Sequence, residues 1–233
     1  MVQIFMELPI TNFPDAPELK DSLKESAHTK DQPSFKDQRR DRIIQVARSV
    51  FYEVGYAGAS MSMISNRLGG SKATLYAYFN SKEELFEAIV REQCGEMAAL
   101  FQRHIGSDDL RSSLTVMARQ LMGAVMSDGV IRTIQLVVEE SYRNPHLSEM
   151  FHNVIQSQGR DNLIGLLQAA HDKGQIDAPN IAEATMVLKS LLFGDCHFKR
   201  IMNLAPEPTE GQLHRQIDLA VDVFMTYYGR PTD

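Results

Sequence analysis

The sequence predicts an all-α protein, and three observations lead to this prediction. From residue 37 onward, apolar residues recur at spacings of three and four, and no segment shows the alternation of a β-strand. Glycines and prolines fall between these periodic segments, where helices are expected to end. The chain has 233 residues, which is long enough to bury a substantial core without disulfides. We therefore expect a bundle of helices.

Three helices are expected first. The first covers residues 37–54 and ends at Gly55, because glycine readily ends a helix. The second follows Ser60 and breaks at Gly69-Gly70. The third is short and follows Ser71, which is a good N-cap residue.

Longer helices are expected after residue 80. The next one opens with Ser81 and Glu84, which we expect to form a capping box, and runs to about residue 104. Residues 1–36 hold four prolines and show no sustained period, so we expect a flexible extension there. The remaining predicted helices cover residues 109–126, 130–142, 145–171, 181–203 and 210–228.

The composition argues against several classes of protein. Two cysteines, Cys94 and Cys196, are too few for a disulfide-dense secreted scaffold. No stretch approaches the roughly 20 apolar residues of a membrane span, and the N-terminus lacks the pattern of a secretory signal, so we expect a cytoplasmic protein with no membrane partner. The histidines lack metal-ligand spacing and no local catalytic signature occurs, so we expect no metal, no cofactor and no enzymatic activity. A catalytic triad assembled in three dimensions stays open.

The charge is distributed unevenly. The net charge is −6, yet residues 36–82 hold eight basic and three acidic side chains, a balance of +5. The rest of the chain then carries −11. One basic segment on an acidic body is typical of a protein that presents one face to a polyanion, although charge runs are usually solvated surface.

Residues 60–79 form the pattern that indicates this partner. A short helix, a glycine turn and a second short helix match the helix-turn-helix, whose second helix enters the major groove of DNA. Leu75 and Phe79 form the apolar inner face of that second helix. Small and polar residues, which let the backbone approach base edges, form its outer face: Lys72, Ala73, Thr74, Tyr76 and Ala77.

Lys82 adds a second indication. A cation in the first turn of a helix opposes the helix dipole. A bound phosphate would reverse this penalty, since free backbone N–H groups and the lysine would bind the same anion. The alternative is that Lys82 is simply solvated.

These motifs carry a resemblance to a known family. The blocks that carry it are FYEVGY at 51–56, TLYAYF at 74–79 and SKEEL at 81–85. Residues 37–85 resemble the DNA-binding domain of the TetR family of transcriptional regulators. The stretches at 144–151 and 191–195 resemble, more weakly, the AefR-type C-terminal domain.

The resemblance implies a helix-turn-helix DNA-binding domain at residues 37–85 and a helical ligand-binding and dimerisation domain at residues 86–233. In this interpretation Ser60 caps a helix and touches a phosphate, and Tyr78 and Lys82 hold the DNA backbone. Lys72, Ala73, Thr74 and Tyr76 face bases, and Arg42 and Ser71 complete the predicted DNA-binding set.

Three positions depart from the pattern of the family. Gly70 stands where a branched apolar residue is usual, Ser65 where alanine is usual, and Ala73 where glycine is common. Gly70 is expected to loosen the turn, and Ser65 to add a polar atom where the helices cross. Neither change removes a predicted phosphate contact.

The predicted function is a homodimeric repressor that binds a double-stranded DNA operator and is released by a small apolar or amphipathic ligand. The last two helices of each chain are expected to pair as a four-helix bundle. Most apolar residues at helical spacing are ordinary core, and we interpret one subset as lining a ligand site: Met97, Phe101, Met117, Leu121, Met126, Leu136, Phe151, Ile155, Phe193 and His197. The alternative is a helical small-molecule-binding or catalytic scaffold with a vestigial DNA-binding head.

Overall fold

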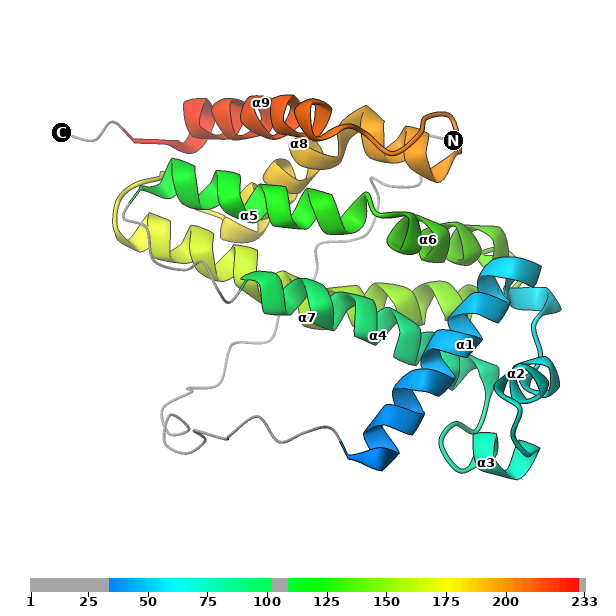
Figure 1. The fold of residues 1–233 in the computed structure, drawn as a ribbon. Helices are drawn as coiled ribbons and strands as arrows, with labels where there is room; N and C mark the ends of the chain where they lie inside the picture. Colours follow the sequence, from blue (N-terminus) through cyan, green and yellow to red (C-terminus); the bar gives the residue numbers. More distant parts are fainter. Residues whose placement is uncertain (1–33, 102–108, 231–233) are drawn as a thin grey trace, which may run out of the picture.

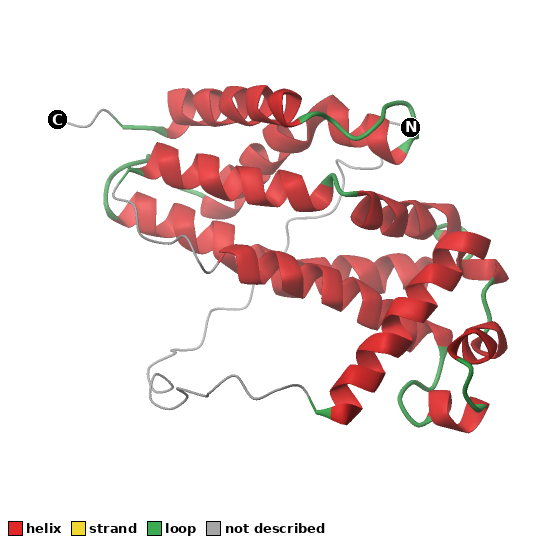
Figure 2. Ribbon diagram, in the orientation of Figure 1, coloured by secondary structure: helices red, strands yellow, loops and turns green. Residues whose placement is uncertain are grey.

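The structure, a computed structural model, describes residues 34–101 and 109–230, and within them the side chains of all but residues 96–101 and 156–162. In this part of the chain every regular element is a helix, and a single antiparallel bridge joins Ile176 to Gly229 (Figure 2). The prediction of an all-α fold is confirmed. The expected N-terminal extension lies outside the described residues up to residue 33.

The observed helices match the predicted ones in order, with ends that differ by a few residues. They are α1 (Phe35–Gly58), α2 (Met61–Leu68), α3 (Lys72–Tyr76), α4 (Lys82–Phe101), α5 (Leu110–Val125), α6 (Asp128–Glu140), α7 (Pro145–Asp172), α8 (Ile181–Ile201) and α9 (Glu210–Tyr228).

The first helix is longer than predicted at both ends. It begins at Phe35 because Ser34 and Asp37 form a capping box: the Ser34 hydroxyl accepts from the Asp37 amide at 3.2 Å, and the Asp37 carboxylate accepts from the Ser34 amide at 3.2 Å. Gly55 leaves the helical conformation with φ 77°, as predicted, but helical turns resume after this kink and continue to Gly58.

The helices enclose two apolar cores. The N-terminal core holds Phe51, Leu75 and Phe79, together with Phe86 from α4. It is completed by residues from α6 and α7: Leu136, Val137, Leu147 and Val154. Packing therefore continues across residue 85, where the predicted domain boundary lies.

The C-terminal core is formed by helices from the second half of the chain. Its buried residues come from α5, α7, α8 and α9 and include Leu114, Met122, Leu188 and Phe224. Figure 1 shows α1, α2 and α3 at one end of the molecule, with α8 and α9 lying along the opposite side.

No single helix in the described ranges is both long and apolar enough to cross a membrane. By length and composition alone, α5 and α6 would pass as a pair, but they are bent by 61° relative to each other.

Candidate nucleic-acid interface

The helix-turn-helix is built from local capping interactions. The Ser60 hydroxyl accepts from the Met63 amide at 3.2 Å and caps α2. Gly69 ends α2 in the left-handed conformation, with φ 67°, which glycine adopts without strain. The Ser71 hydroxyl accepts from the Thr74 amide at 3.1 Å and caps α3. Both predicted caps are confirmed.

Ser65 closes the turn between α2 and α3. Its side chain is buried, and its hydroxyl donates a hydrogen bond of 3.1 Å to the carbonyl oxygen of Gly70. The hydroxyl at this position therefore fixes the backbone of the turn rather than leaving an unpaired polar atom where the helices cross.

The short helix α3 and the residues that follow it present the predicted apolar face, and the outer face is as predicted except at Thr74. Leu75 is only 1% exposed and Phe79 is equally buried, so both pack in the N-terminal core. Thr74 and Tyr78 are half-buried, and the Thr74 hydroxyl lies 3.0 Å from the Ser71 hydroxyl. The exposed face consists of Lys72, Ala73, Tyr76 and Ala77.

Lys82 has partners that the sequence did not reveal. Its ammonium donates to the carbonyl oxygens of Tyr56 at 3.0 Å and of Ala59 at 3.5 Å. It also lies 4.4 Å from the centre of the Tyr56 ring, in cation–π contact. These groups at the end of α1 offset the unfavourable position of a cation at the start of α4. The dipole argument therefore does not by itself require a phosphate.

The start of α4 differs in one detail from the predicted capping box. The Ser81 hydroxyl accepts from the Glu84 amide at 3.2 Å, as expected. The Glu84 carboxylate, however, accepts from the Asn80 amide at 2.7 Å and not from Ser81. The reciprocal bond is shifted by one residue because Asn80 also donates its side-chain amide to this carboxylate, at 3.1 Å.

Apart from Lys82, the cations of the N-terminal end fall into two groups. Arg48, Arg67 and Arg91 each form an ion pair with a carboxylate. A second group has no carboxylate partner among the described residues: Lys36, Arg39, Arg40, Arg42 and Lys72. Within this group the Arg40 guanidinium lies 5.2 Å from the centre of the Phe79 ring. The predicted site contains Arg42 and Lys72 and leaves out the other three, because the charge count does not show which cations a fold neutralises.

The described members of the predicted ligand set lie in different parts of the molecule. Met117 and Met126 are buried in the C-terminal core, and Leu121 and Phe193 pack against it. Leu136 is buried in the N-terminal core, against which Phe151 packs. Ile155 is exposed, and the side chains of Met97 and Phe101 lie outside the described residues.

His197 is the polar member of this predicted set. Its ring stacks on Phe193 with the ring centres 5.0 Å apart, and its Nε2 atom is buried without a hydrogen-bond partner among the described residues. Burial lowers the pKa of His197 from its ordinary value of 6.5. Burial thus disfavours the protonated form of this side chain, which places an unsatisfied polar atom beside an aromatic ring.

A cavity of about 410 Å³ lies between α8 and α9 and is lined by other residues. Its wall includes the cations Lys199, Arg200 and Arg215 and the apolar side chain of Leu219. None of the described residues predicted to bind a ligand lines it.

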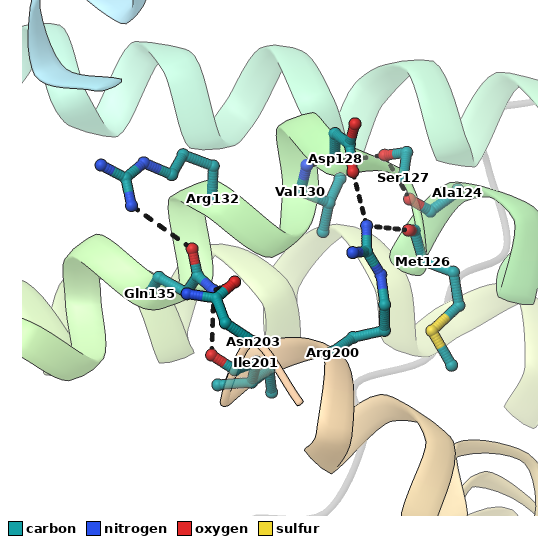
Figure 3. Close-up of polar contacts among 10 residues, drawn as sticks. All are labelled: Ala124, Met126, Ser127, Asp128, Val130, Arg132, Gln135, Arg200, Ile201 and Asn203. Atoms are coloured by element: carbon teal, nitrogen blue, oxygen red, sulfur yellow. Dashed lines mark hydrogen bonds and ion pairs between the residues drawn. The ribbon is translucent and has the colours of Figure 1, made fainter. Parts of the chain in front are cut away.

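Polar contacts join α6 to α8 (Figure 3). Arg200 of α8 is buried and donates to the carbonyl oxygen of Met126 at 3.3 Å and to the carboxylate of Asp128 at 2.5 Å. Gln135 of α6 donates to the carbonyl oxygen of Ile201, at the end of α8, at 2.9 Å.

Further polar contacts join α6 to α1 and α4. Arg132 of α6 donates to the carbonyl oxygen of Tyr52 in α1 at 3.0 Å. The Tyr52 hydroxyl donates to the carbonyl oxygen of Gly129 at 2.7 Å and accepts from Gln93 of α4 at 3.2 Å. Helix α6 is thus bonded both to the helix-turn-helix end and to α8.

The fold and this arrangement define a helix-turn-helix protein with a helical C-terminal body. Two family models match the chain: "Bacterial regulatory proteins, tetR family" over residues 43–89, and "AefR-like transcriptional repressor, C-terminal domain" over residues 112–230. The chain belongs to the TetR family of transcriptional regulators, as the sequence resemblance predicted.

Individual relatives agree with this assignment. The chain is 28% identical over 180 residues to the HTH-type transcriptional regulator UidR of Escherichia coli K12, an alignment that covers 74% of this chain and 84% of UidR. It is 38% identical over 60 residues to the HTH-type transcriptional repressor AcnR of Corynebacterium diphtheriae, covering 26% of this chain and 32% of AcnR.

Solved structures share the fold. A putative TetR-family regulator from Mesorhizobium loti superposes with a TM-score of 0.74 at 24% identity, covering 83% of this chain and 98% of the other. The flavonoid-responsive regulator FrrA gives a TM-score of 0.68 at 26% identity, covering 84% and 99%.

Proposed function

We propose that this protein is a homodimeric repressor that binds a specific double-stranded DNA operator through α3 and is released from it by a small apolar or amphipathic ligand. One observation carries the DNA-binding part. The exposed face of α3 adjoins a group of cations that have no carboxylate partner among the described residues. Cations without carboxylate partners, next to a helix that can enter the major groove, fit the phosphates and base edges of duplex DNA.

The outer face of α3 supplies the residues that read bases. Ala73 and Ala77 are exposed and small, so the backbone of α3 can approach the base edges closely. Lys72 and Tyr76 are exposed beside them, with Tyr76 at 48%. Thr74 is half-buried, and its methyl and hydroxyl groups suit contact with a thymine methyl or a base edge.

The surrounding residues hold the DNA backbone. An ammonium has three donors, and the two carbonyl oxygens that Lys82 contacts leave one donor for a phosphate. Ser60, Ser71 and Tyr78 lie at the ends of α2 and α3, and Arg42 is exposed on α1. These contacts fix orientation and carry no sequence information of their own.

The proposed dimer uses the face of α8 and α9. Large apolar side chains are exposed on α9 at four-residue spacing: Leu219, Val223 and Tyr227, with Tyr227 at 79%. Met186 and Phe198 are exposed on α8, and Met202 is exposed directly after it. An apolar surface of this extent marks an interaction site, and a four-helix bundle with a second copy would cover it. The two α3 helices would then meet half-sites about 34–36 Å apart.

The proposed response to a ligand rests on His197 and α6. A ligand with an apolar body and one hydrogen-bonding group would satisfy the buried His197 Nε2 atom beside Phe193. Both residues lie on α8, whose end is bonded to α6, and α6 is bonded to α1. A ligand that binds one arrangement of α8 more tightly than another would therefore shift the spacing of the two α3 helices. FrrA, described as flavonoid-responsive, supports a ligand-responsive role by its similarity.

Selection of bound sequences from random duplex DNA tests the base-reading part of the proposal. We expect an inverted repeat with half-sites about one helical turn apart. Thr74→Val should change the preference among bases at one position of each half-site, by about 1–3 kcal/mol of binding free energy. Val138→Asp, which changes an exposed side chain of α6, should select the same sequence as the unchanged protein. A uniform loss of affinity in Thr74→Val, with the same preferred bases, would contradict base reading.

A further inference from the structure

Two adjacent glycines form the turn before α3, and only one of them is explained by its backbone. Gly69 has φ 67°, a conformation that other residues rarely adopt. Gly70 has no such requirement, since its φ lies outside the left-handed region. A Cβ atom at Gly70 would lie 3.4 Å from Nη2 of Arg39, and no other atom outside its immediate neighbours lies within 4 Å of that position. The guanidinium of Arg39 therefore occupies the space beside Gly70.

Arg39 reaches this turn from the first helix. It lies on α1, and its side chain is half-buried. The turn that it contacts is fixed from the other side, because the buried Ser65 hydroxyl binds the Gly70 carbonyl oxygen at 3.1 Å. The Ser65 hydroxyl thus fixes the turn, and Gly70, which has no side chain, leaves the space beside it to the Arg39 guanidinium.

The charge of Arg39 is not neutralised within the described residues, where it has no ion pair or hydrogen bond. Elsewhere in the fold, buried or half-buried arginines do find partners: Arg48 pairs with Glu92, and Arg200 with Asp128. A guanidinium that is partly withdrawn from water and unpaired is costly unless an anion completes its bonding.

We propose that Arg39 binds a phosphodiester of the DNA backbone beside the start of α3, and that the missing side chain of Gly70 is what gives it access to this position. The inference rests on the proposed function and extends it to a residue outside the predicted site. Gly70 directly precedes Ser71, the N-cap of α3. In a helix-turn-helix the N-terminal residues of the second helix approach the bases, so the groove edge, with its phosphates, lies next to this turn. The planar fork of arginine matches the oxygens of a phosphate.

The test measures binding of the full chain to a labelled duplex of arbitrary sequence, about 30 base pairs long, as the salt concentration rises from about 50 to 200 mM. Arg39→Gln should weaken binding about tenfold at 0.1 M salt and lower the slope of log affinity against log salt by about 0.9. Arg39→Lys should keep the slope, because it keeps the charge. Arg119→Gln, an exposed arginine of α5, serves as the matched control and should change neither quantity.

Gly70→Val tests whether Arg39 needs the open space beside Gly70 to bind DNA. The added side chain should displace the guanidinium, so this variant should lose as much affinity and slope as Arg39→Gln, and the double variant should lose no more than either single one. Gly70→Ala, whose added atom meets only the flexible end of Arg39, is the milder second variant. Thermal melting of each variant shows whether it is folded.

The outcomes separate this inference from the proposed function. If the unchanged protein binds the duplex and Arg39→Gln shows the same salt slope, Arg39 does not bind phosphate. The inference about Arg39 is then overturned, while the proposed function stands. If the losses of Arg39→Gln and Gly70→Val multiply in the double variant, the link between the two residues is overturned. If the unchanged, folded protein binds no duplex, the proposed function falls and the inference falls with it.

Discussion

Two surfaces of the molecule expose different kinds of side chain. The surface around α3 exposes cations that no carboxylate of the described chain neutralises, among them Lys36, Arg42 and Lys72. The surface of α8 and α9, on the opposite side in Figure 1, exposes large apolar side chains such as Leu219 and Tyr227.

The difference indicates two different partners. A cation without an ion-pair partner is stabilised beside a polyanion. An exposed apolar side chain is stabilised when it is buried away from water. The first surface therefore fits DNA, and the second fits another protein surface of the same kind. In the proposed symmetric dimer two half-sites are bound together, so the apolar surface would control the affinity of the basic surface for DNA.

The largest effect is expected from breaking the apolar surface. The double variant Leu219→Asp with Val223→Asp places two carboxylates where the proposed four-helix bundle excludes water. We expect a monomer in analytical ultracentrifugation and a loss of operator affinity of about a hundredfold or more, since each half-site is then bound separately.

The matched control is Val138→Asp. It makes the same kind of change at an exposed residue that belongs to neither α8 nor α9, and should leave the dimer and its affinity intact. A double variant that remains a dimer would show that α8 and α9 do not form the interface.

The next largest effect is expected on the basic surface. Lys82→Ala should weaken binding to all duplex sequences alike, by about tenfold at 0.1 M salt, and lower the salt slope by about 0.9. It should also lower the melting temperature, because its bonds to the Tyr56 and Ala59 carbonyl oxygens are lost. Lys173→Ala, an exposed lysine at the end of α7, is the control. A lower melting temperature with an unchanged slope would leave Lys82 with a structural role only.

A smaller effect is expected on the link between the two surfaces. Tyr52→Phe removes the hydroxyl that joins α1 to α6 through Gly129 and should lower the free energy of unfolding by about 1–2 kcal/mol in urea titrations. Tyr142 is 96% exposed, so Tyr142→Phe should leave the free energy of unfolding unchanged. Equal stabilities of the two variants would mean that the Tyr52 hydroxyl does not hold α6 against α1.

The smallest effect is expected on the pH dependence of stability. Burial lowers the pKa of His197 below 6.5, so between that lowered value and 6.5 the unfolded chain binds a proton that the folded chain does not. Stability therefore falls as the pH drops through this window. His197→Gln should make the free energy of unfolding less dependent on pH there, whereas His146→Gln, at an exposed histidine, should keep more of the dependence. Identical pH profiles for His197→Gln and the unchanged protein would show that His197 is not shielded from water.

The sequence predicted the helices and the two faces of α3 because these depend on local spacing and capping. Ser60, Gly69 and Ser71 act on their immediate neighbours, and their roles are visible in the order of residues. The predicted partner of the Glu84 carboxylate was wrong by one residue, because the amide of Asn80, and not that of Ser81, donates to it.

Contacts between distant segments could not be predicted in this way. The partners of Lys82 lie at the end of α1, and the neighbour of Arg39 is Gly70. The predicted ligand set shares helical spacing, but the fold divides it between two cores, placing Leu136 in one and Met117 in the other. Periodicity shows which residues are buried and not which residues they meet.

The most direct test is to titrate the folded 233-residue protein with duplex DNA at low ionic strength and then to raise the salt. We expect binding that weakens linearly in a plot of log affinity against log salt, with a slope that reflects several phosphate contacts. We also expect that Lys72→Ala, Tyr76→Ala and Arg39→Gln each weaken this binding. A protein that retains its helical circular dichroism and binds no duplex at any salt concentration would contradict the proposed DNA binding.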